Sequence, residues 1–301
     1  MIKRKIIIIS GPTGSGKSDL ALKLAKRFNG FLISADSRQV YKGMDIGTNK
    51  DDVQPRLNKF FVQGVEECLI DIVSPDEPFT LSDWTAAAKK AIEDRPDKLP
   101  IIVGGTGLYV SALINNYKLP AFDRQLRSEL EEQLAKKGIE YLLKRLKKIE
   151  PAVEKKIDVH NPRRVLRALE ICLQTNKPLA KIKGASEFDF LPLGIAVEKE
   201  KLHSLLDKRT ENQFKSGWIE ETKNLIAKGY LAKLASMSGI GYQSVCRYLR
   251  NEISLEQAIE LIKRDNRRYA KRQMTWLKKE KSIVWIKNFD EAAALVKNFL
   301  E

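Results

Sequence analysis

The sequence has few of the residues that mark a cross-linked or metal-stabilised protein. It contains only three cysteines, Cys68, Cys172 and Cys246, and only two histidines, His160 and His203. Paired cysteines define a disulfide framework, and Cys or His residues at short, regular spacing define a zinc site. The sequence shows neither pattern, so we expect the cysteines to be small buried residues of a protein in a reducing compartment, the cytoplasm.

Long apolar runs are also missing. No stretch approaches the roughly 18 apolar residues of a membrane-spanning helix. The basic start of the chain is followed only by Ile6–Ile9 before a polar segment with glycine and proline, and this run predicts a strand, not a signal peptide. We therefore expect no membrane contact, and a hydrophobic content of 43% over 301 residues can fill a sizeable core.

Negative charge is scarce relative to positive charge. The formal net charge is +15, and most of the excess lies in the later two thirds of the chain. Such an uneven distribution indicates a polyanionic partner held by that part of the molecule, with an affinity that falls as salt rises. From charge alone, a lysine-rich solvated surface is an equally good explanation.

Short apolar runs alternate with helical patterns in the first part of the chain. Ile6–Ile9, Phe31–Ser34 and Ile101–Val103 are bounded by Gly, Pro or Ser, as is typical of strands buried on both faces of a parallel sheet. Apolar residues recur at helical spacing between them. The pattern predicts an α/β fold whose parallel sheet is flanked by helices.

From residue 116 the sequence becomes charged and helical, which predicts a helical insertion domain over 116–190 between two parts of one core, 1–115 and 191–301. The elements expected in the insertion and after it are helices at Leu126–Lys137, Tyr141–Ile149 and Arg163–Gln174, a strand at Leu193–Val197, a helix ending near Gly229, a long helix at Leu255–Lys281 and a last strand at Ile283–Ile286. We expect Trp218 and Trp285 to lie in the core.

A phosphate-binding loop follows the first predicted strand. The residues match the P-loop pattern G-x-x-x-x-G-K-[ST] and open a helix; they are Gly11, Pro12, Thr13, Gly14, Ser15, Gly16, Lys17 and Ser18. The glycines let backbone N–H groups surround a phosphate, Lys17 contacts its oxygens and Ser18 can bind Mg²⁺. The loop predicts a P-loop core with a bound diphosphate and magnesium, but it does not tell which diphosphate compound binds.

A carboxylate follows the second predicted strand. Asp36 comes directly after Phe31–Ser34 and Ala35, at the edge where open α/β sheets build their sites. We expect it to lie near the P-loop. From its position alone, Asp36 could be a catalytic group, a cap of a turn or a ligand of a magnesium-bound water.

Several blocks of the sequence together resemble one family, the tRNA dimethylallyltransferases, also called tRNA isopentenyltransferases. The resemblance covers essentially the whole chain, and no zinc-finger pattern follows its last block, so the similarity is to the bacterial form of the family. The blocks are Gly11–Ser18, Ala35–Thr48, Gly104–Tyr109, Asn161–Glu170, Gly239–Tyr242 and Arg267–Trp276.

The resemblance implies an activity and catalytic residues. The family transfers the dimethylallyl group of dimethylallyl diphosphate to N6 of adenosine 37, beside the anticodon of tRNA, and releases pyrophosphate. By the resemblance, Asp36 is the general base, and Thr13 and Arg209 assist the leaving group. An arginine fork suits diphosphate oxygens, and a positioned base can take the proton of the weakly nucleophilic amine.

The resemblance also implies contacts with the anticodon stem-loop of tRNA by a protein that we expect to be a monomer. The residues expected to contact tRNA are Asp36, Ser37, Arg38, Gln39, Thr106, Arg127, His160, Asn161, Pro162, Arg163, Arg164, Arg268, Lys271 and Arg272. Arg268 and Lys271 belong to a basic run at helical spacing, for which a solvated helix face is the alternative interpretation.

Two other functions fit parts of the sequence. A P-loop kinase of nucleotides or small metabolites shares the phosphate loop, although it does not require the Asp36 block or the basic later segments. A non-catalytic RNA-binding ATPase is the other alternative, although no convincing acidic residue for ATP hydrolysis follows Ile101–Val103.

Overall fold

The computed structural model describes residues 3–50, 54–56, 59–118, 120, 122–179 and 184–301. The chain forms two compact units. The larger unit contains Met1–Ile114 and Glu187–Glu301, and the smaller one is Asn115–Ser186. The insertion expected at 116–190 differs from the smaller unit at its end, because residues from Phe188 onward already belong to a strand of the larger unit.

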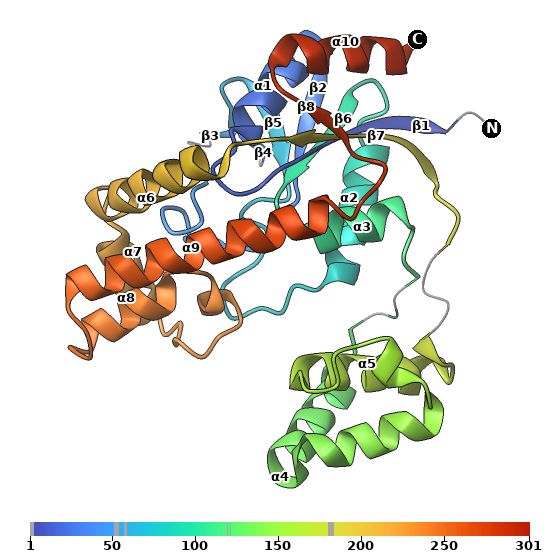
Figure 1. Ribbon diagram of the computed structural model, residues 1–301, viewed down its shortest axis with the longest axis vertical. Coiled ribbons are helices and arrows are strands. Elements are labelled where there is room, and N and C mark those ends of the chain that lie inside the picture. The colour runs from blue at the N-terminus through green and yellow to red at the C-terminus, as the bar shows by residue number, and fades with distance from the viewer. Residues whose placement is uncertain (1–2, 51–53, 57–58, 119, 121, 180–183) are drawn as a thin grey trace. The chain divides into compact units, whose positions relative to one another are not determined.

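One sheet organises the larger unit (Figure 1). Within the described residues it has eight strands in the order β3-β4-β5-β2-β6-β1-β7-β8. The strands are β1 (Arg4–Ser10), β2 (Gly30–Ser34), β3 (Gln54–Arg56), β4 (Lys59–Val62), β5 (Val65–Cys68), β6 (Leu99–Gly104), β7 (Phe188–Ile195) and β8 (Val284–Ile286).

The sheet confirms the predicted α/β fold and adds an antiparallel edge. Strands β5, β2, β6, β1, β7 and β8 pair in parallel, whereas β3, β4 and β5 pair antiparallel. This edge was not predicted, because β5 carries Glu66 and Glu67 in place of an apolar run. The predicted strand Leu193–Val197 begins earlier, since β7 pairs with β1 from Phe188 opposite Arg4.

The central strand β1 shows why apolar runs form this sheet. Ile6–Ile9 are completely buried. Alternate side chains of a strand point to opposite faces, and Ile7 and Ile9 accordingly join one core cluster while Ile6 and Ile8 join another. Helices cover both faces of the sheet and bury these side chains.

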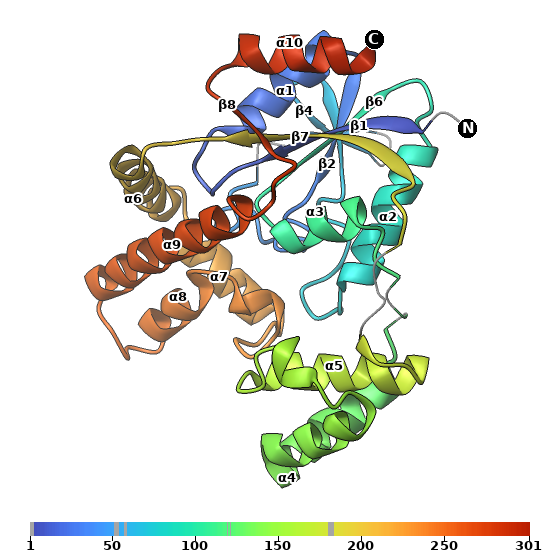
Figure 2. The ribbon, with the colours of Figure 1, turned by 45° about the vertical axis from the view of Figure 1, so that its right-hand side comes forward.

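The helices of the larger unit form two groups, one that covers the two faces of the sheet and one whose members pack against one another. Helices α1 and α10 cover one face of the sheet and α2 and α3 the other (Figure 2). Helices α6 to α9 pack against one another and share a third core cluster with the segment after β2. These helices are α1 (Lys17–Arg27), α2 (Leu81–Glu93), α3 (Gly107–Ile114), α6 (Lys199–Lys215), α7 (Trp218–Ala227), α8 (Tyr242–Leu249), α9 (Leu255–Leu277) and α10 (Phe289–Leu300).

The two tryptophans expected in the core differ. Trp218 is buried in the cluster of α7 and α8, as predicted. Trp285 is 36% exposed, so that prediction was wrong. It lies on β8, an edge strand of the sheet, where its ring packs over Gly194 while one side meets solvent.

The smaller unit is helical, with its own core. It contains α4 (Arg124–Ile149), a short 3₁₀ helix (Val153–Lys155) and α5 (Pro162–Thr175), packed through a separate apolar cluster. Helix α4 is interrupted at Gly138, whose φ of 72° leaves the helical region. This interruption explains why the sequence predicted two helices there.

None of the helices in the described ranges has the length and apolar character needed to cross a bilayer.

Candidate active site

The P-loop joins the carboxyl end of β1 to the first turn of α1. Gly14 and Gly16 both have φ values of 80°, a conformation that favours glycine. No side chain caps the first turn of α1, and the buried Ser15 Oγ has no hydrogen-bond partner within the described part of the chain. The N–H groups of the first turn and Ser15 Oγ together form a set of donors that fits an anion.

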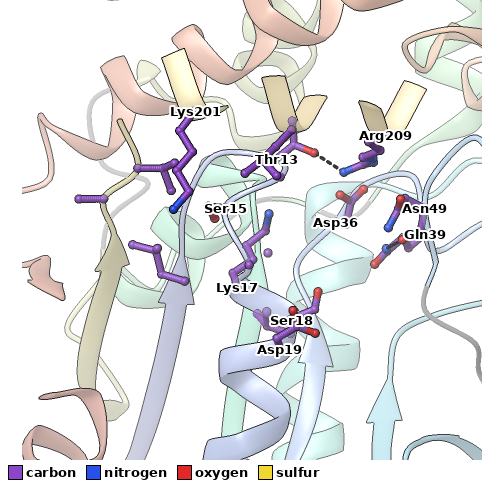
Figure 3. A pocket seen from close by; sticks show the side chains of 18 of the residues that line it. Thr13, Ser15, Lys17, Ser18, Asp19, Asp36, Gln39, Asn49, Lys201 and Arg209 are labelled. Carbon is purple, nitrogen blue, oxygen red and sulfur yellow. Dashed lines mark hydrogen bonds between the residues drawn. The ribbon is translucent and has the colours of Figure 1, made fainter. Parts of the chain in front are cut away.

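A cavity of about 750 Å³ opens over this loop. Besides Thr13–Asp19, its lining includes Asp36, Gln39, Asn49, Lys201 and Arg209 (Figure 3). Thus the structure places Asp36 beside the P-loop, as its position after β2 predicted. Gly11 and Pro12, the first two residues of the loop, are buried, and the Pro12 carbonyl accepts a hydrogen bond of 3.3 Å from Lys17 Nζ.

Arg209 and Thr13 meet at one end of the cavity. Arg209 Nη1 donates a hydrogen bond of 2.7 Å to Thr13 Oγ1 (Figure 3). Thr13, Asp36 and Arg209 also line a second cavity, of about 260 Å³. The three residues expected to be catalytic therefore stand where two cavities adjoin, one over the phosphate loop and one beyond it.

The segment around Asp36 is held by its neighbours. Asp36 Oδ1 accepts a hydrogen bond of 2.8 Å from the Arg38 backbone N–H, and Thr106 Oγ1 accepts one of 3.2 Å from the Ser37 N–H. Gln39 receives a hydrogen bond of 2.9 Å from Ser34 Oγ and donates one of 3.2 Å to the Asn49 carbonyl. These contacts bring together Asp36–Gln39 and Thr106, which the family resemblance implied as contacts of tRNA.

Arg38 has structural contacts in addition to the RNA contact expected of it. Its guanidinium donates hydrogen bonds of 2.6 Å to the Ala235 carbonyl and 3.2 Å to Ser238 Oγ. The side chain therefore holds the segment that leads into Gly239–Tyr242. The sequence did not predict this role, because the two segments are about 200 residues apart.

The second cavity also has lining residues to which the sequence assigned no role in binding or catalysis. They come from the segment after β2 and from the region of α7 and α8, and include Gly47, Trp218, Gly239, Ile240 and Tyr242. The available signals were that Gly47 and Gly239–Tyr242 belong to blocks resembling a known family. Nothing in those blocks by itself indicates which cavity they line.

Two tyrosines beside this cavity stay protonated at neutral pH. The pKa of Tyr242 is raised, mainly by burial and secondly by the charge of Glu221. The Tyr242 hydroxyl donates a hydrogen bond of 2.8 Å to Glu221 Oε1. The pKa of Tyr269 is likewise raised, mainly by burial and secondly by the charge of Asp36. Both hydroxyls therefore remain hydrogen-bond donors.

Helix α9 carries basic side chains on its solvent side. Arg268 is 62% exposed, and Lys271 and Arg272 are exposed as well, whereas Ala270 and Gln273 are buried. The Arg272 guanidinium lies 5.6 Å from the centre of the Tyr269 ring and lines the second cavity. The positive side of this helix therefore borders the cavity that contains Asp36.

In the smaller unit, Arg127 is paired within the protein. It contacts Glu131 at 2.8 Å and Glu170 at 3.2 Å, and the fully buried Glu170 also binds Arg167 at 2.8 Å. A carboxylate without access to solvent requires such partners. Arg127 thus has a structural contact in addition to the RNA contact expected of it.

The first turn of α5 presents the other expected residues of this unit. The Asn161 side chain caps the helix by accepting hydrogen bonds from the N–H groups of Arg163 and Arg164. Pro162 occupies the first helical position, where its missing N–H has no cost. The side chains of His160, Arg163 and Arg164 are exposed.

The fold and this site define a class of protein: a P-loop α/β enzyme in which a phosphate-binding loop and a carboxylate share one cavity. Comparisons with known proteins identify its family. A family model described as IPP transferase matches residues 39–280. The tRNA dimethylallyltransferase of Acetivibrio thermocellus is 41% identical over 97% of this chain and 95% of its own length. The tRNA dimethylallyltransferase 2 of Geotalea daltonii is 45% identical over 94% of this chain and 88% of its own.

Solved structures agree with the sequence relatives. The tRNA isopentenylpyrophosphate transferase of Bacillus halodurans has a TM-score of 0.70 at 37% identity, covering 99% of this chain and 96% of that one. A eukaryotic dimethylallyltransferase acting on tRNA has a TM-score of 0.76 at 29% identity, and the match covers 94% of this chain and 74% of that one. The chain belongs to the IPP transferase family, whose curated members named here are tRNA dimethylallyltransferases.

Proposed function

We propose that this protein transfers the dimethylallyl group of dimethylallyl diphosphate to N6 of adenosine 37 in the anticodon loop of tRNA and releases pyrophosphate. The observation that carries the proposal is the position of Asp36, Thr13 and Arg209 where two cavities adjoin. One cavity contains the donors for a diphosphate, and the other is bordered by a basic helix. A group that moves from a diphosphate to a base must cross such a junction.

The diphosphate is the leaving group of the reaction. The bond between the allylic carbon and the diphosphate oxygen breaks, and its electron pair stays on that oxygen. The P-loop N–H groups and Lys17 stabilise the charge that develops there, and the Thr13–Arg209 pair adds donors at the end nearest Asp36. A guanidinium fork suits this role because it can bind two oxygens at once.

The base must lose a proton as the new bond forms. The N6 amine of adenine attacks the allylic carbon, and the Asp36 carboxylate takes the proton that N6 gives up. Before that, the base has to leave its stack and enter the second cavity. That cavity, whose lining includes the buried rings of Trp218 and Tyr242, offers the Tyr269 ring and the Arg272 guanidinium as surfaces for a base.

Magnesium fits the phosphate side of the site. Ser18 lines the first cavity with Asp19, and a P-loop serine shares Mg²⁺ with phosphate oxygens. The described residues contain no cluster of three or more His, Cys, Asp or Glu side chains for a metal. We infer that bound Mg²⁺ is held by Ser18 together with the diphosphate, whose charge it neutralises.

The anticodon stem-loop of tRNA is the proposed partner of the basic residues. On the larger unit these are Arg268, Lys271 and Arg272, which border the second cavity or lie beside it on α9. On the smaller unit they are Arg127 and the residues of the His160–Arg164 segment. We further propose that the protein acts as a monomer in the cytoplasm.

One experiment tests the proposed function against the kinase alternative. The protein is incubated with unmodified tRNA, Mg²⁺ and dimethylallyl diphosphate, and in parallel with ATP and nucleotides, and the nucleosides are analysed by mass. We expect a prenyl mass increment on adenosine. Phosphorylated product from ATP, without that increment, would decide for a kinase.

A further inference from the structure

Gln273 on α9 connects two loops of the active site. The residue is only 7% exposed. Its Oε1 accepts a hydrogen bond of 2.9 Å from the Thr13 N–H, and its Nε2 donates one of 2.9 Å to the Gly105 carbonyl. A side chain at position 105 would collide with Gln273 Nε2, so glycine there permits the close approach.

The hydrogen bond to Thr13 orients one residue of the P-loop. The Thr13 N–H points to Gln273 and is therefore unavailable to a phosphate, which leaves Thr13 to act through its side chain. That side chain accepts the 2.7 Å hydrogen bond from Arg209. The amide of Gln273 thus fixes the backbone from which the Thr13–Arg209 pair extends.

The hydrogen bond to Gly105 reaches the segment of the general base. Gly105 precedes Thr106, whose Oγ1 accepts a hydrogen bond from the N–H of Ser37, the residue after Asp36. The Gln273 amide therefore contacts the P-loop, which binds the leaving group, and also the segment that contacts the residue after Asp36. It does so from the helix whose exposed face carries Arg268 and Lys271.

We propose that Gln273 is a positioning residue of the transfer reaction, which holds Thr13 so that its hydroxyl and Arg209 face the diphosphate. The inference rests on the proposed function for its effect on turnover. Loss of the amide leaves the Thr13 N–H without its partner in a partly buried place. A displacement of about 1 Å at a reacting centre can lower a rate by about 10²-fold.

The test is a double-mutant cycle between Gln273→Met and Thr13→Ala. Methionine fills the volume of glutamine without its donor and acceptor. Each single variant should lower kcat by about 10- to 100-fold with the affinity for tRNA unchanged, and each should weaken calorimetric binding of pyrophosphate by about tenfold. Because Gln273 contacts the diphosphate side only through Thr13, the losses of pyrophosphate affinity in the double variant should not multiply.

Gln243→Met is the matched control. The amide of Gln243 also makes two hydrogen bonds to the backbone, although it is the donor in both, to the carbonyls of Ala232 and Met237, and it lines neither cavity of the active site. This variant should keep kcat and pyrophosphate affinity, and thermal unfolding should show that all the variants are folded at the assay temperature.

The outcomes separate the two proposals. Losses of pyrophosphate affinity that multiply in the double variant, or a Gln273→Met protein with unchanged kcat and pyrophosphate binding, would overturn the role of Gln273. A wild-type protein that binds pyrophosphate but forms no prenylated adenosine would overturn the proposed function instead. In that case the pyrophosphate cycle still decides whether Gln273 positions Thr13.

Discussion

Arg209 Nη1 on α6 and Thr13 Oγ1 in the P-loop lie 2.7 Å apart, although 196 positions separate the two residues in the sequence. The hydrogen bond links a helix after the insertion to the first loop of the chain. It places a permanent positive charge at the end of the first cavity that is shared with Asp36. The charge is therefore at the point where a departing diphosphate oxygen would gain its electron pair.

Arg209→Met should lower kcat by about 10²-fold, because it removes a donor from the developing charge. The kcat of Arg209→Lys should lie between those of Arg209→Met and the wild type, since lysine keeps the charge but loses the planar fork. Steady-state kinetics of tRNA prenylation measure both. Lys208→Gln on the same helix, which removes a charge outside the cavities, should retain kcat; an equal loss there would point to net charge as the cause.

Asp36→Asn should keep diphosphate binding and lose turnover by about 10²- to 10⁴-fold, the usual contribution of a positioned base. The amide has nearly the shape of the carboxylate but accepts no proton from N6. Single-turnover prenylation and calorimetry with dimethylallyl diphosphate measure the two effects separately. Asp76→Asn changes an exposed carboxylate that lines neither cavity, and it should stay active. Near-normal turnover of Asp36→Asn would refute the role of Asp36 as the base.

The parts of this site that the sequence predicted are those that local patterns encode. The P-loop has a required order of residue types, and the apolar run before Asp36 predicts a buried strand whose end lies at the sheet edge. Arg209 lies within a charged helix, and only the family resemblance indicated its role. Nothing local in its sequence distinguishes it from Lys208.

Contacts between distant segments could not be predicted. Gln273 belongs to a block that resembles the family, but its two hydrogen bonds depend on how α9 packs beside the P-loop and Gly105. The hydrogen bonds of Arg38 likewise depend on tertiary packing, since the carbonyl groups that it binds come from the segment after α7. Such contacts arise from tertiary packing, whereas a sequence pattern describes only neighbours along the chain.

Replacing Arg268 and Lys271 with glutamine should weaken tRNA binding and lower its salt dependence. Each phosphate contact that is lost should reduce the slope of log affinity against log salt by about 1. Filter binding or fluorescence titration at several salt concentrations measures the slope. The control replaces Lys223 and Lys297, which are also exposed, with glutamine and removes the same charge from α7 and α10. If both pairs change the slope equally, α9 is only a solvated basic surface.

Glu66→Gln should lower the free energy of unfolding at neutral pH and have a smaller effect in acid. Glu66 lies on β5 with only 3% exposure and contacts Arg95 at 2.6 Å and Lys59 at 3.1 Å. Burial alone would raise its pKa, but the hydrogen bonds from Arg95 and Lys59 outweigh burial and lower the pKa from 4.5 to about 2. A carboxyl whose pKa is lower in the folded state contributes stability above its unfolded pKa and loses it as the pH falls through the folded value.

The expected loss for Glu66→Gln is roughly 3 kcal/mol at pH 7, from the size of the pKa shift. The difference from wild type should shrink as the pH falls from 4.5 towards 2. Urea unfolding at a series of pH values measures it. Glu93→Gln, an exposed residue at the end of α2, should show little difference at any pH. A Glu66→Gln difference that stayed constant from pH 7 to the acid range would mean that the ion pair with Arg95 does not produce the pKa shift, because only a proton-linked contribution varies with pH.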